Sequence, residues 1–125
     1  MNVVGRIVVG GAIVMAGACS SPTEYRAEAL RVTVSPPQLT LTNTSDRRVA
    51  YIVAERNFAA LALFSCLSAD SPWLGPSGEV SLLYSSITGY EAGKSREAIV
   101  WFATFTDTDV GCIDQARIKT LVVKL

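Results

Sequence analysis

From Leu30 onward, apolar residues recur at every second position in one segment after another, and this period limits the fold to one built from β-strands. The clearest case is the stretch 30–34, "LRVTV", in which Leu and Val alternate with Arg and Thr. Successive side chains of a strand point to opposite faces, so the pattern predicts one buried and one exposed face. The expected strands are residues 30–34, 39–42, 48–55, 57–66, 80–84, 97–105 and 118–125.

Two of these segments are apolar on both faces, which predicts a position in the middle of a sheet. They are 48–55, "RVAYIVAE", and 97–105, "EAIVWFATF". The stretch 57–66, "NFAALALFSC", is ambiguous, because Ala and Leu favour a helix whereas its length and its neighbours favour a strand. We expect a strand there.

Turn-forming residues separate the strands at short intervals. These connections are Pro36-Pro37 and residues 43–46, 67–78, 85–95 and 106–111, which are rich in Pro, Gly, Asn, Asp and Ser. The spacing is too short for the helical crossovers that parallel strands need. The sequence therefore predicts an all-β fold, a single antiparallel β-sandwich of about seven strands, in a chain long enough for one domain.

The N-terminal residues have the order of parts of a signal peptide. One positive charge, Arg6, precedes the apolar run 7–15, and the small residues 16–18 follow it. The uncharged run ends at Cys19 and is shorter than the roughly 20 apolar residues that cross a bilayer as a helix. We expect residues 1–18 to be a cleaved signal peptide, 19–29 the N-terminus and a tether, and 30–125 the sandwich domain.

The stretch 15–19, "MAGAC", resembles the lipobox of bacterial lipoproteins, with Ala16 where that motif usually has Leu. The resemblance implies that Cys19 becomes the lipid-modified N-terminus and holds the protein on a membrane of the bacterial cell envelope, facing the periplasm or the cell surface. Cleavage of an ordinary secreted protein at the same bond, or an uncleaved anchor, is the alternative.

The cysteine count agrees with lipidation. An exported chain with three cysteines has an odd number, and modifying Cys19 leaves Cys66 and Cys112 as an even pair. Disulfides persist in exported proteins, so we expect these two to be bonded. Two separate buried thiols are the alternative.

The sandwich pattern also resembles immunoglobulin-like and fibronectin-like domains. Two stretches resemble small bacterial lipoproteins that carry one such domain of unassigned function: 39–61, "LTLTNTSDRRVAYIVAERNFAAL", and 86–102, "SITGYEAGKSREAIVWF". This resemblance implies the architecture and transfers no functional residues.

The composition excludes several kinds of chemistry. The chain has no histidine, which removes Ser-His and Cys-His nucleophiles and the imidazole ligands of most zinc and copper sites. Lys94 and Ser95 are adjacent and lack the spacing of a Ser-x-x-Lys pair. Lys and Arg equal Asp and Glu in number, so nothing indicates a nucleic-acid surface. We expect no catalytic residues, no cofactor and no metal.

Asp107, Asp109 and Asp114 surround one turn, and closely spaced carboxylates are typical of calcium loops. The spacing departs from the EF-hand pattern, because Gly111 stands at the fifth loop position instead of the sixth. A solvated hairpin loop is the simpler interpretation, and a calcium-dependent or enzymatic domain remains an alternative function.

Two aromatic residues, Trp73 and Tyr90, lie in expected loops, where they either cover an end of the sandwich or contact a partner. Arg47 and Arg48 beside a turn indicate a solvated sheet edge. We expect a noncatalytic, membrane-anchored lipoprotein of the cell envelope that acts as a binding or accessory module for an envelope protein or glycan. The alternative is an inhibitor that presents residues 67–78 to an exported protease.

Overall fold

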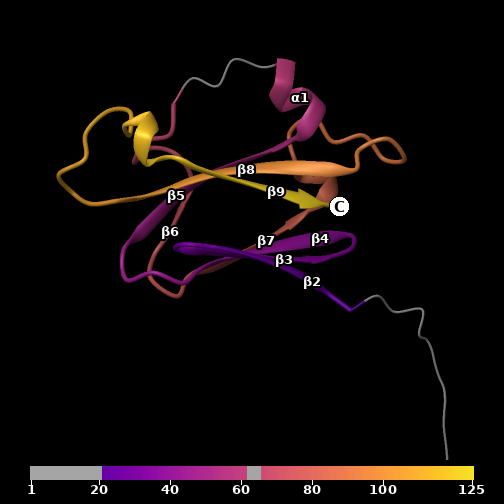
Figure 1. Cartoon of the computed structure of the whole chain (residues 1–125), viewed down its shortest axis with the longest axis horizontal. Helices are drawn as coiled ribbons and strands as arrows, with labels where there is room; N and C mark the ends of the chain where they lie inside the picture. The colour runs from indigo at the N-terminus through magenta and orange to yellow at the C-terminus, as the bar shows by residue number, and fades with distance from the viewer. Residues whose placement is uncertain (1–20, 62–65) are drawn as a thin grey trace, which may run out of the picture.

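The chain folds into two four-stranded antiparallel sheets that pack face to face, as Figure 1 shows for the computed structural model. The structure describes residues 21–61 and 66–125, so the expected signal peptide and Cys19 lie outside the described residues. One sheet has the order β2-β3-β4-β7 and the other β6-β5-β8-β9. The strands are β2 (Thr23–Ala27), β3 (Leu30–Ser35), β4 (Gln38–Asn43), β5 (Arg48–Glu55), β6 (Trp73–Leu74), β7 (Glu79–Leu83), β8 (Glu97–Phe105) and β9 (Lys119–Lys124).

The described residues therefore form the expected antiparallel β-sandwich, with eight strands where about seven were expected. Strands β3 and β4 form a hairpin around Pro36-Pro37, and the chain then crosses to the second sheet between β4 and β5. With β3, β4 and β7 taken as A, B and E, and β5, β8 and β9 as C, F and G, the sheet neighbours are those of an immunoglobulin-like sandwich. As predicted, β5 and β8 are the central strands of their sheet.

The expectation of a strand at 57–66 is wrong for the part that the structure describes. Residues Arg56–Leu61 form the short helix α1, and residues 62–65 lie outside the described residues. The helix begins where the Glu55 carboxylate accepts a hydrogen bond from the backbone N–H of Phe58 at 2.9 Å. A side chain that caps the first turn and the Ala-rich composition together stabilise a helix over a strand.

The sandwich also begins earlier than the expected boundary at residue 30. Strand β2 pairs along its whole length with β3, within the segment 19–29 that was expected to be a tether. Its alternation is weak, because only Tyr25 and Ala27 of this strand pack against the core, and both are only half-buried. The Tyr25 hydroxyl accepts a hydrogen bond from the backbone N–H of Lys124 at 3.1 Å and so joins β2 to the other sheet.

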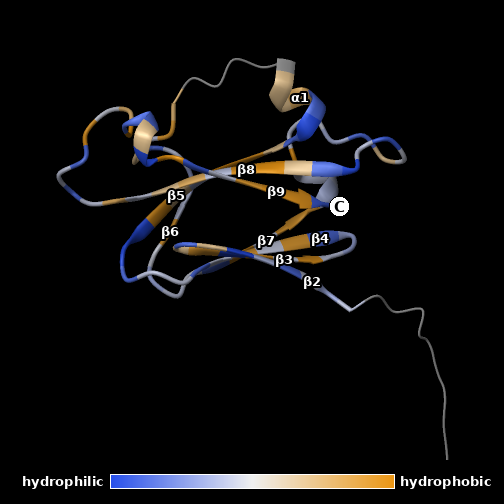
Figure 2. Ribbon diagram, viewed as in Figure 1, coloured by the Kyte–Doolittle hydropathy of each residue, from blue (hydrophilic) through white to orange (hydrophobic). Residues whose placement is uncertain are grey.

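The main core lies between the sheets, where the apolar side chains of both inner faces meet. Figure 2 shows the hydrophobic residues spread along the strands of both sheets. Phe102 is the largest fully buried side chain. The other buried members of this core are Leu30, Val32, Val34, Leu39, Leu41, Val49, Leu74, Tyr84, Ile87, Ala98, Val100 and Val123. Removal of this apolar area from water is the main force that holds the two sheets together.

A second, smaller core covers the outer face of the β5–β8 sheet. There Ala50, Ala103 and Phe105 are buried beneath Leu67 and Ile113, which come from two different loops. The loops are joined by a hydrogen bond of 2.7 Å from the Ile113 N–H to the Leu67 carbonyl. Because β5 and β8 are apolar on both faces, these loops bury surface that would otherwise be exposed.

The side chain of Asn43 joins the segments at which the chain leaves one sheet for the other. It is 1 % exposed, and its amide nitrogen lies 2.6 Å, 3.0 Å and 2.9 Å from the carbonyl oxygens of Arg47, Leu74 and Gly75. Its side-chain oxygen accepts a hydrogen bond from the Ser45 N–H at 2.9 Å. One buried amide thus satisfies backbone groups of two separate connections, which would be costly to leave unpaired.

We expect Asn43→Ala to lower the free energy of unfolding by about 2–4 kcal/mol, because the backbone carbonyls of Arg47, Leu74 and Gly75 and the Ser45 N–H each lose a hydrogen-bond partner at this buried site. Asn43→Asp should cost at least as much, since a carboxylate cannot donate to those carbonyls. Urea unfolding measures both losses. Asn57→Asp is the matched control, because Asn57 is exposed and the same change there should leave the unfolding midpoint nearly unchanged. Equal effects at the two positions would contradict the role assigned to Asn43.

Candidate functional site

The functional candidates lie at the two opposite ends of the sandwich. At the Lys124 end, β2 and β8 begin and β5, β7 and β9 end, and helix α1 lies beside them (Figure 1). At the Trp73 end lie strand β6, the crossing between β4 and β5, and the long connection between β8 and β9.

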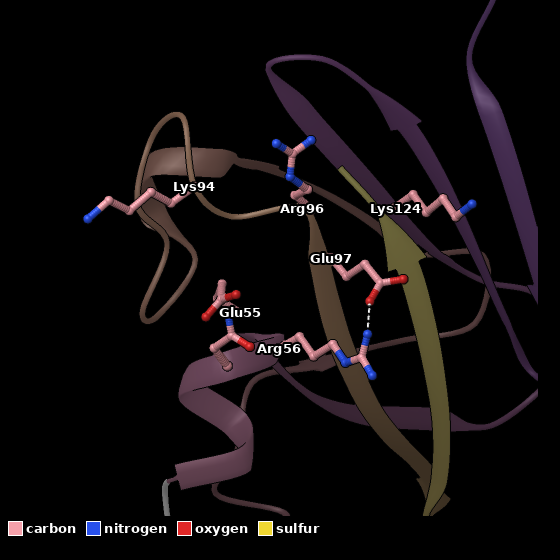
Figure 3. Close-up of a pocket in the computed structure, with 7 residues that line it drawn as sticks. Glu55, Arg56, Lys94, Arg96, Glu97 and Lys124 are labelled. Atoms are coloured by element: carbon pink, nitrogen blue, oxygen red, sulfur yellow. Dashed lines mark hydrogen bonds and ion pairs between the residues drawn. The ribbon is translucent and has the colours of Figure 1, made fainter.

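An open groove with a volume of about 550 Å³ lies at the Lys124 end. We call it the basic groove. It is lined by Glu55, Arg56, Asn57, Lys94, Arg96, Glu97 and Lys124 (Figure 3). These residues come from the end of β5, the start of α1, the connection before β8, the start of β8 and the end of β9. The lining thus holds four cations and two carboxylates.

Both carboxylates of the groove are engaged with the protein itself. Glu97 forms an ion pair with Arg56, and Glu55 is 4 % exposed and caps α1. In contrast, Arg96 and Lys124 have no carboxylate within ion-pair distance among residues 21–61 and 66–125. The groove therefore presents unneutralised positive charge to solvent.

The positive charge of Lys94 is also only weakly offset by a carboxylate. Its ammonium lies 3.8 Å from the Glu91 carboxylate, and the two side chains are 82 % and 67 % exposed, so water screens this contact. The neighbouring Ser95 hydroxyl accepts a hydrogen bond from the Glu91 N–H at 2.8 Å. Lys94 and Ser95 thus both contact Glu91, Lys94 through the carboxylate and Ser95 through the backbone N–H.

Figure 3 shows that the cations surround the groove and do not converge on one point. The Lys94 and Lys124 side chains extend away from each other, and Arg96 extends in a third direction. A discrete phosphate site gathers several donors on one anion. This arrangement instead offers positive charge over a broad face.

At the Trp73 end, an aromatic and cationic patch is partly exposed. We call Trp73, Phe105 and Arg48 the Trp73 patch. The rings of Trp73 and Phe105 meet edge to face with centroids 6.1 Å apart, and the Arg48 guanidinium lies 5.4 Å and 4.8 Å from these two centroids. Arg48 also pairs with Asp107, which fixes its position. Trp73 remains 47 % exposed, so it both covers Phe105 and offers apolar surface to solvent.

The structure does not bring the two candidate aromatic residues together. Tyr90 lies at the Lys124 end, is half-buried and packs against the buried Tyr84, with ring centroids 5.7 Å apart. Burial raises the pKa of Tyr84, and the neighbouring Tyr90 and Tyr25 raise it further. Tyr90 therefore belongs to the covering of the core, whereas Trp73 keeps a free face.

The three aspartates of the possible calcium loop are each engaged in a different interaction. Asp107 pairs with Arg48, and Asp114 accepts a hydrogen bond from the Ala116 N–H at 3.0 Å. Asp109 lies 2.7 Å from an Arg117 guanidinium nitrogen and accepts a hydrogen bond from the Thr106 N–H at 2.8 Å. Within the described residues, no three acidic or cysteine side chains form a group that could hold a metal ion.

Cys66 and Cys112 lie at disulfide distance from each other, with Cα atoms 5.5 Å apart. This confirms the expected proximity of the two residues. They stand directly beside Leu67 and Ile113, which cover the outer face of the β5–β8 sheet. The pair therefore joins the two loops that form the second core.

The connection 67–78, which the alternative inhibitor hypothesis would present to a protease, is held against the sandwich along part of its length. It contains β6, which pairs with β5, and Leu74 is only 8 % exposed. The N–H of Gly78 donates to the Gly75 carbonyl at 2.8 Å, which closes the turn that follows. Trp73 is the large apolar side chain that this connection offers to solvent.

No protein-family model, no curated protein and no solved structure matches the chain. None of the helices in residues 21–61 and 66–125 is long and apolar enough to cross a membrane. The candidate sites therefore stand on their own geometry.

The basic groove was not predicted from the sequence. Its unpaired cations, Arg96 and Lys124, are far apart in the chain and meet only because β8 pairs with β9. The one local signal is the stretch 94–96, "KSR", in an expected connection. Pairing of the other cations with carboxylates depends on the fold and leaves no pattern along the chain.

We expect Cys66→Ser together with Cys112→Ser to lower the free energy of unfolding by about 2–4 kcal/mol. The pair closes a loop with a sequence separation of 46, and its loss frees the unfolded chain and loosens the second core. Urea unfolding with and without reductant measures the effect. Reductant should destabilise the unaltered protein and leave the double variant unchanged, and an equal response of both would contradict the bond.

The Asp109 carboxylate makes the fold sensitive to acid. The hydrogen bonds from Arg117 and from the Thr106 N–H lower its pKa from 3.8 to about 2. A carboxyl whose pKa is lower in the folded state stabilises the fold above its unfolded pKa, and this contribution is lost as pH falls from about 4 toward the folded pKa. Carboxyl NMR should give a midpoint of about 2 for Asp109.

The corresponding variant separates this residue from general acid unfolding. Asp109→Asn should flatten the loss of stability over that pH range, whereas Asp46→Asn, on an exposed residue, should not. A titration midpoint near that of a free aspartate would contradict the assignment.

Proposed function

We propose that this protein is a lipid-anchored, noncatalytic binding module of the bacterial cell envelope, which presents its Trp73 end to an envelope partner. The lipobox-like residues "MAGAC" support the anchor on Cys19. The proximity of Cys66 and Cys112 also supports it, since their pairing leaves Cys19 as the remaining cysteine.

One observation carries the orientation in this proposal. Strand β2 begins at Thr23, four residues after Cys19, and it begins at the Lys124 end. Four residues span at most about 14 Å even when fully extended. A lipid on Cys19 would therefore hold the Lys124 end close to the bilayer.

The same geometry supports the Trp73 end as the face for a partner. The strands run from one end of the sandwich to the other, so an anchor at the Lys124 end directs the Trp73 end away from the membrane (Figure 1). An exposed tryptophan backed by an arginine is a frequent anchor in protein interfaces. Val110, in the connection between β8 and β9, is 86 % exposed and adds apolar surface to the same end.

The anchor is tested by the intact mass of the protein from the host membrane fraction. We expect a chain that begins at Cys19 and carries a diacylglyceryl group, with Cys66 and Cys112 alkylated only after reduction. Cys19→Ala should release the chain from the membrane fraction or leave it unprocessed. An unmodified Cys19 in the wild-type protein would refute the proposal.

The partner face is tested in the same membranes with a photo-crosslinking amino acid in place of Val110, whose side chain is exposed. The control carries the crosslinker in place of Leu83, which is 53 % exposed at the Lys124 end. We expect a discrete product from position 110 that Trp73→Ala abolishes and that position 83 does not give. Identical products from both positions would contradict a partner at the Trp73 end.

A further inference from the structure

We propose that the basic groove docks the Lys124 end onto an anionic phospholipid surface, so that the module stands on the membrane in a fixed orientation. This inference rests on the proposed lipid anchor, and it adds a second contact and a chemical class of ligand. The ligand is the phosphate-bearing headgroup layer.

The basic groove lies beside the start of β2 and therefore close to the proposed anchor. Lys124 is at the last position of β9, and its N–H bonds to the hydroxyl of Tyr25 in β2, two residues after the strand begins. The groove and the start of β2 therefore lie side by side. An anchor about 14 Å or less from Thr23 would allow the groove to touch the headgroups, within the Debye length of about 8 Å over which charges attract at physiological salt.

The two ends of the sandwich differ in how far their cations are offset by carboxylates. At the Trp73 end, Arg48 pairs with Asp107 and Arg117 pairs with Asp109. Among the described residues, the cations Arg47 and Lys119 form no ion pair there, but they line one pocket together with the exposed carboxylates Glu28 and Asp46, which offset their charge. At the Lys124 end, Arg96 and Lys124 have no such partner in the described part of the chain, and Lys94 has only a screened one. The end that the anchor holds near the membrane is thus the end with unneutralised positive charge.

The shape of the groove favours a membrane surface over a single anion as its ligand. The cations surround the opening and extend in different directions (Figure 3). A planar layer of headgroups meets such a spread of charges at several points, whereas one free phosphate reaches only one of them. Each Lys or Arg near an anionic surface adds a modest attraction, and the anchor supplies the high local concentration that makes it sufficient.

Chemical labelling of the chain's three lysines tests the docking, because two of them line the groove and the third serves as an internal control. Lys94 and Lys124 line the groove, whereas Lys119 begins β9 near the Trp73 end, and all three are exposed. The lipidated full-length protein is reconstituted in vesicles of phosphatidylcholine alone, or with about one third phosphatidylglycerol. An amine-reactive reagent then labels the lysines, and mass spectrometry gives the extent at each one.

We expect phosphatidylglycerol to slow labelling of Lys94 and Lys124 about fivefold relative to Lys119. High salt should remove this protection, because it screens the contact. Arg96→Glu should also remove it, whereas Arg47→Glu, the same change on an exposed residue of the Trp73 end, should leave it intact. Urea unfolding of both variants checks that each is folded.

The outcomes separate the docking from the anchor. A lipid on Cys19 without protection of Lys94 and Lys124 would overturn the docking and leave the proposed function standing. An unmodified Cys19 would overturn both. Equal protection by inorganic phosphate in phosphatidylcholine vesicles would show a discrete anion site and would overturn docking onto a surface.

Discussion

The buried amide of Asn43 is the contact on which the connection between the two sheets depends. The chain passes from one sheet to the other directly after this residue, so its backbone leaves the regular pairing of the β4 strand there. The amide meets carbonyls from the β4–β5 crossing and from the segment after β6. Because the same side chain holds both segments, it also fixes the position of β6 and therefore of Trp73. The structure of the candidate partner face thus follows from a contact made inside the fold.

The second core shows how a small domain covers a sheet that is apolar on both faces. Strands β5 and β8 bury one face against the other sheet, and within residues 21–61 and 66–125 no third sheet covers the opposite face. Leu67 and Ile113 supply the cover from two loops, and loops ordered by so few apolar contacts gain much from a covalent link between them. Cys66 and Cys112 stand beside these two residues for that reason.

The strands that obey the period of two could be predicted from the sequence, and those that depend on partners could not. The central strands β5 and β8 were predicted with their observed bounds, because β-branched and aromatic residues fill both faces. Strand β2 has only Tyr25 and Ala27 toward the core, so its pairing with β3 holds it more than its own pattern does. Helix α1 depends on a cap from the Glu55 side chain. Because Glu55 was assigned to the preceding strand, its role as a cap was not recognised from the sequence. For the site, Trp73 was found as a loop aromatic, whereas the basic groove arises from pairing between strands.

The formal net charge of zero conceals a difference between the two ends of the sandwich. At the Trp73 end, two arginines hold loops in place through ion pairs with aspartates, and their charge serves the fold. At the Lys124 end, Glu97 pairs with Arg56 and Glu55 caps a helix, so both carboxylates of the groove interact with the protein itself. Arg96 and Lys124 form no ion pair within the described residues. What a surface offers to a ligand is the charge left after internal pairing, because paired groups have already exchanged hydration for contact. By that measure the Lys124 end keeps unpaired cations, whereas the Trp73 end offers an exposed aromatic side chain. The proposed docking and the proposed partner contact rest on these two different faces.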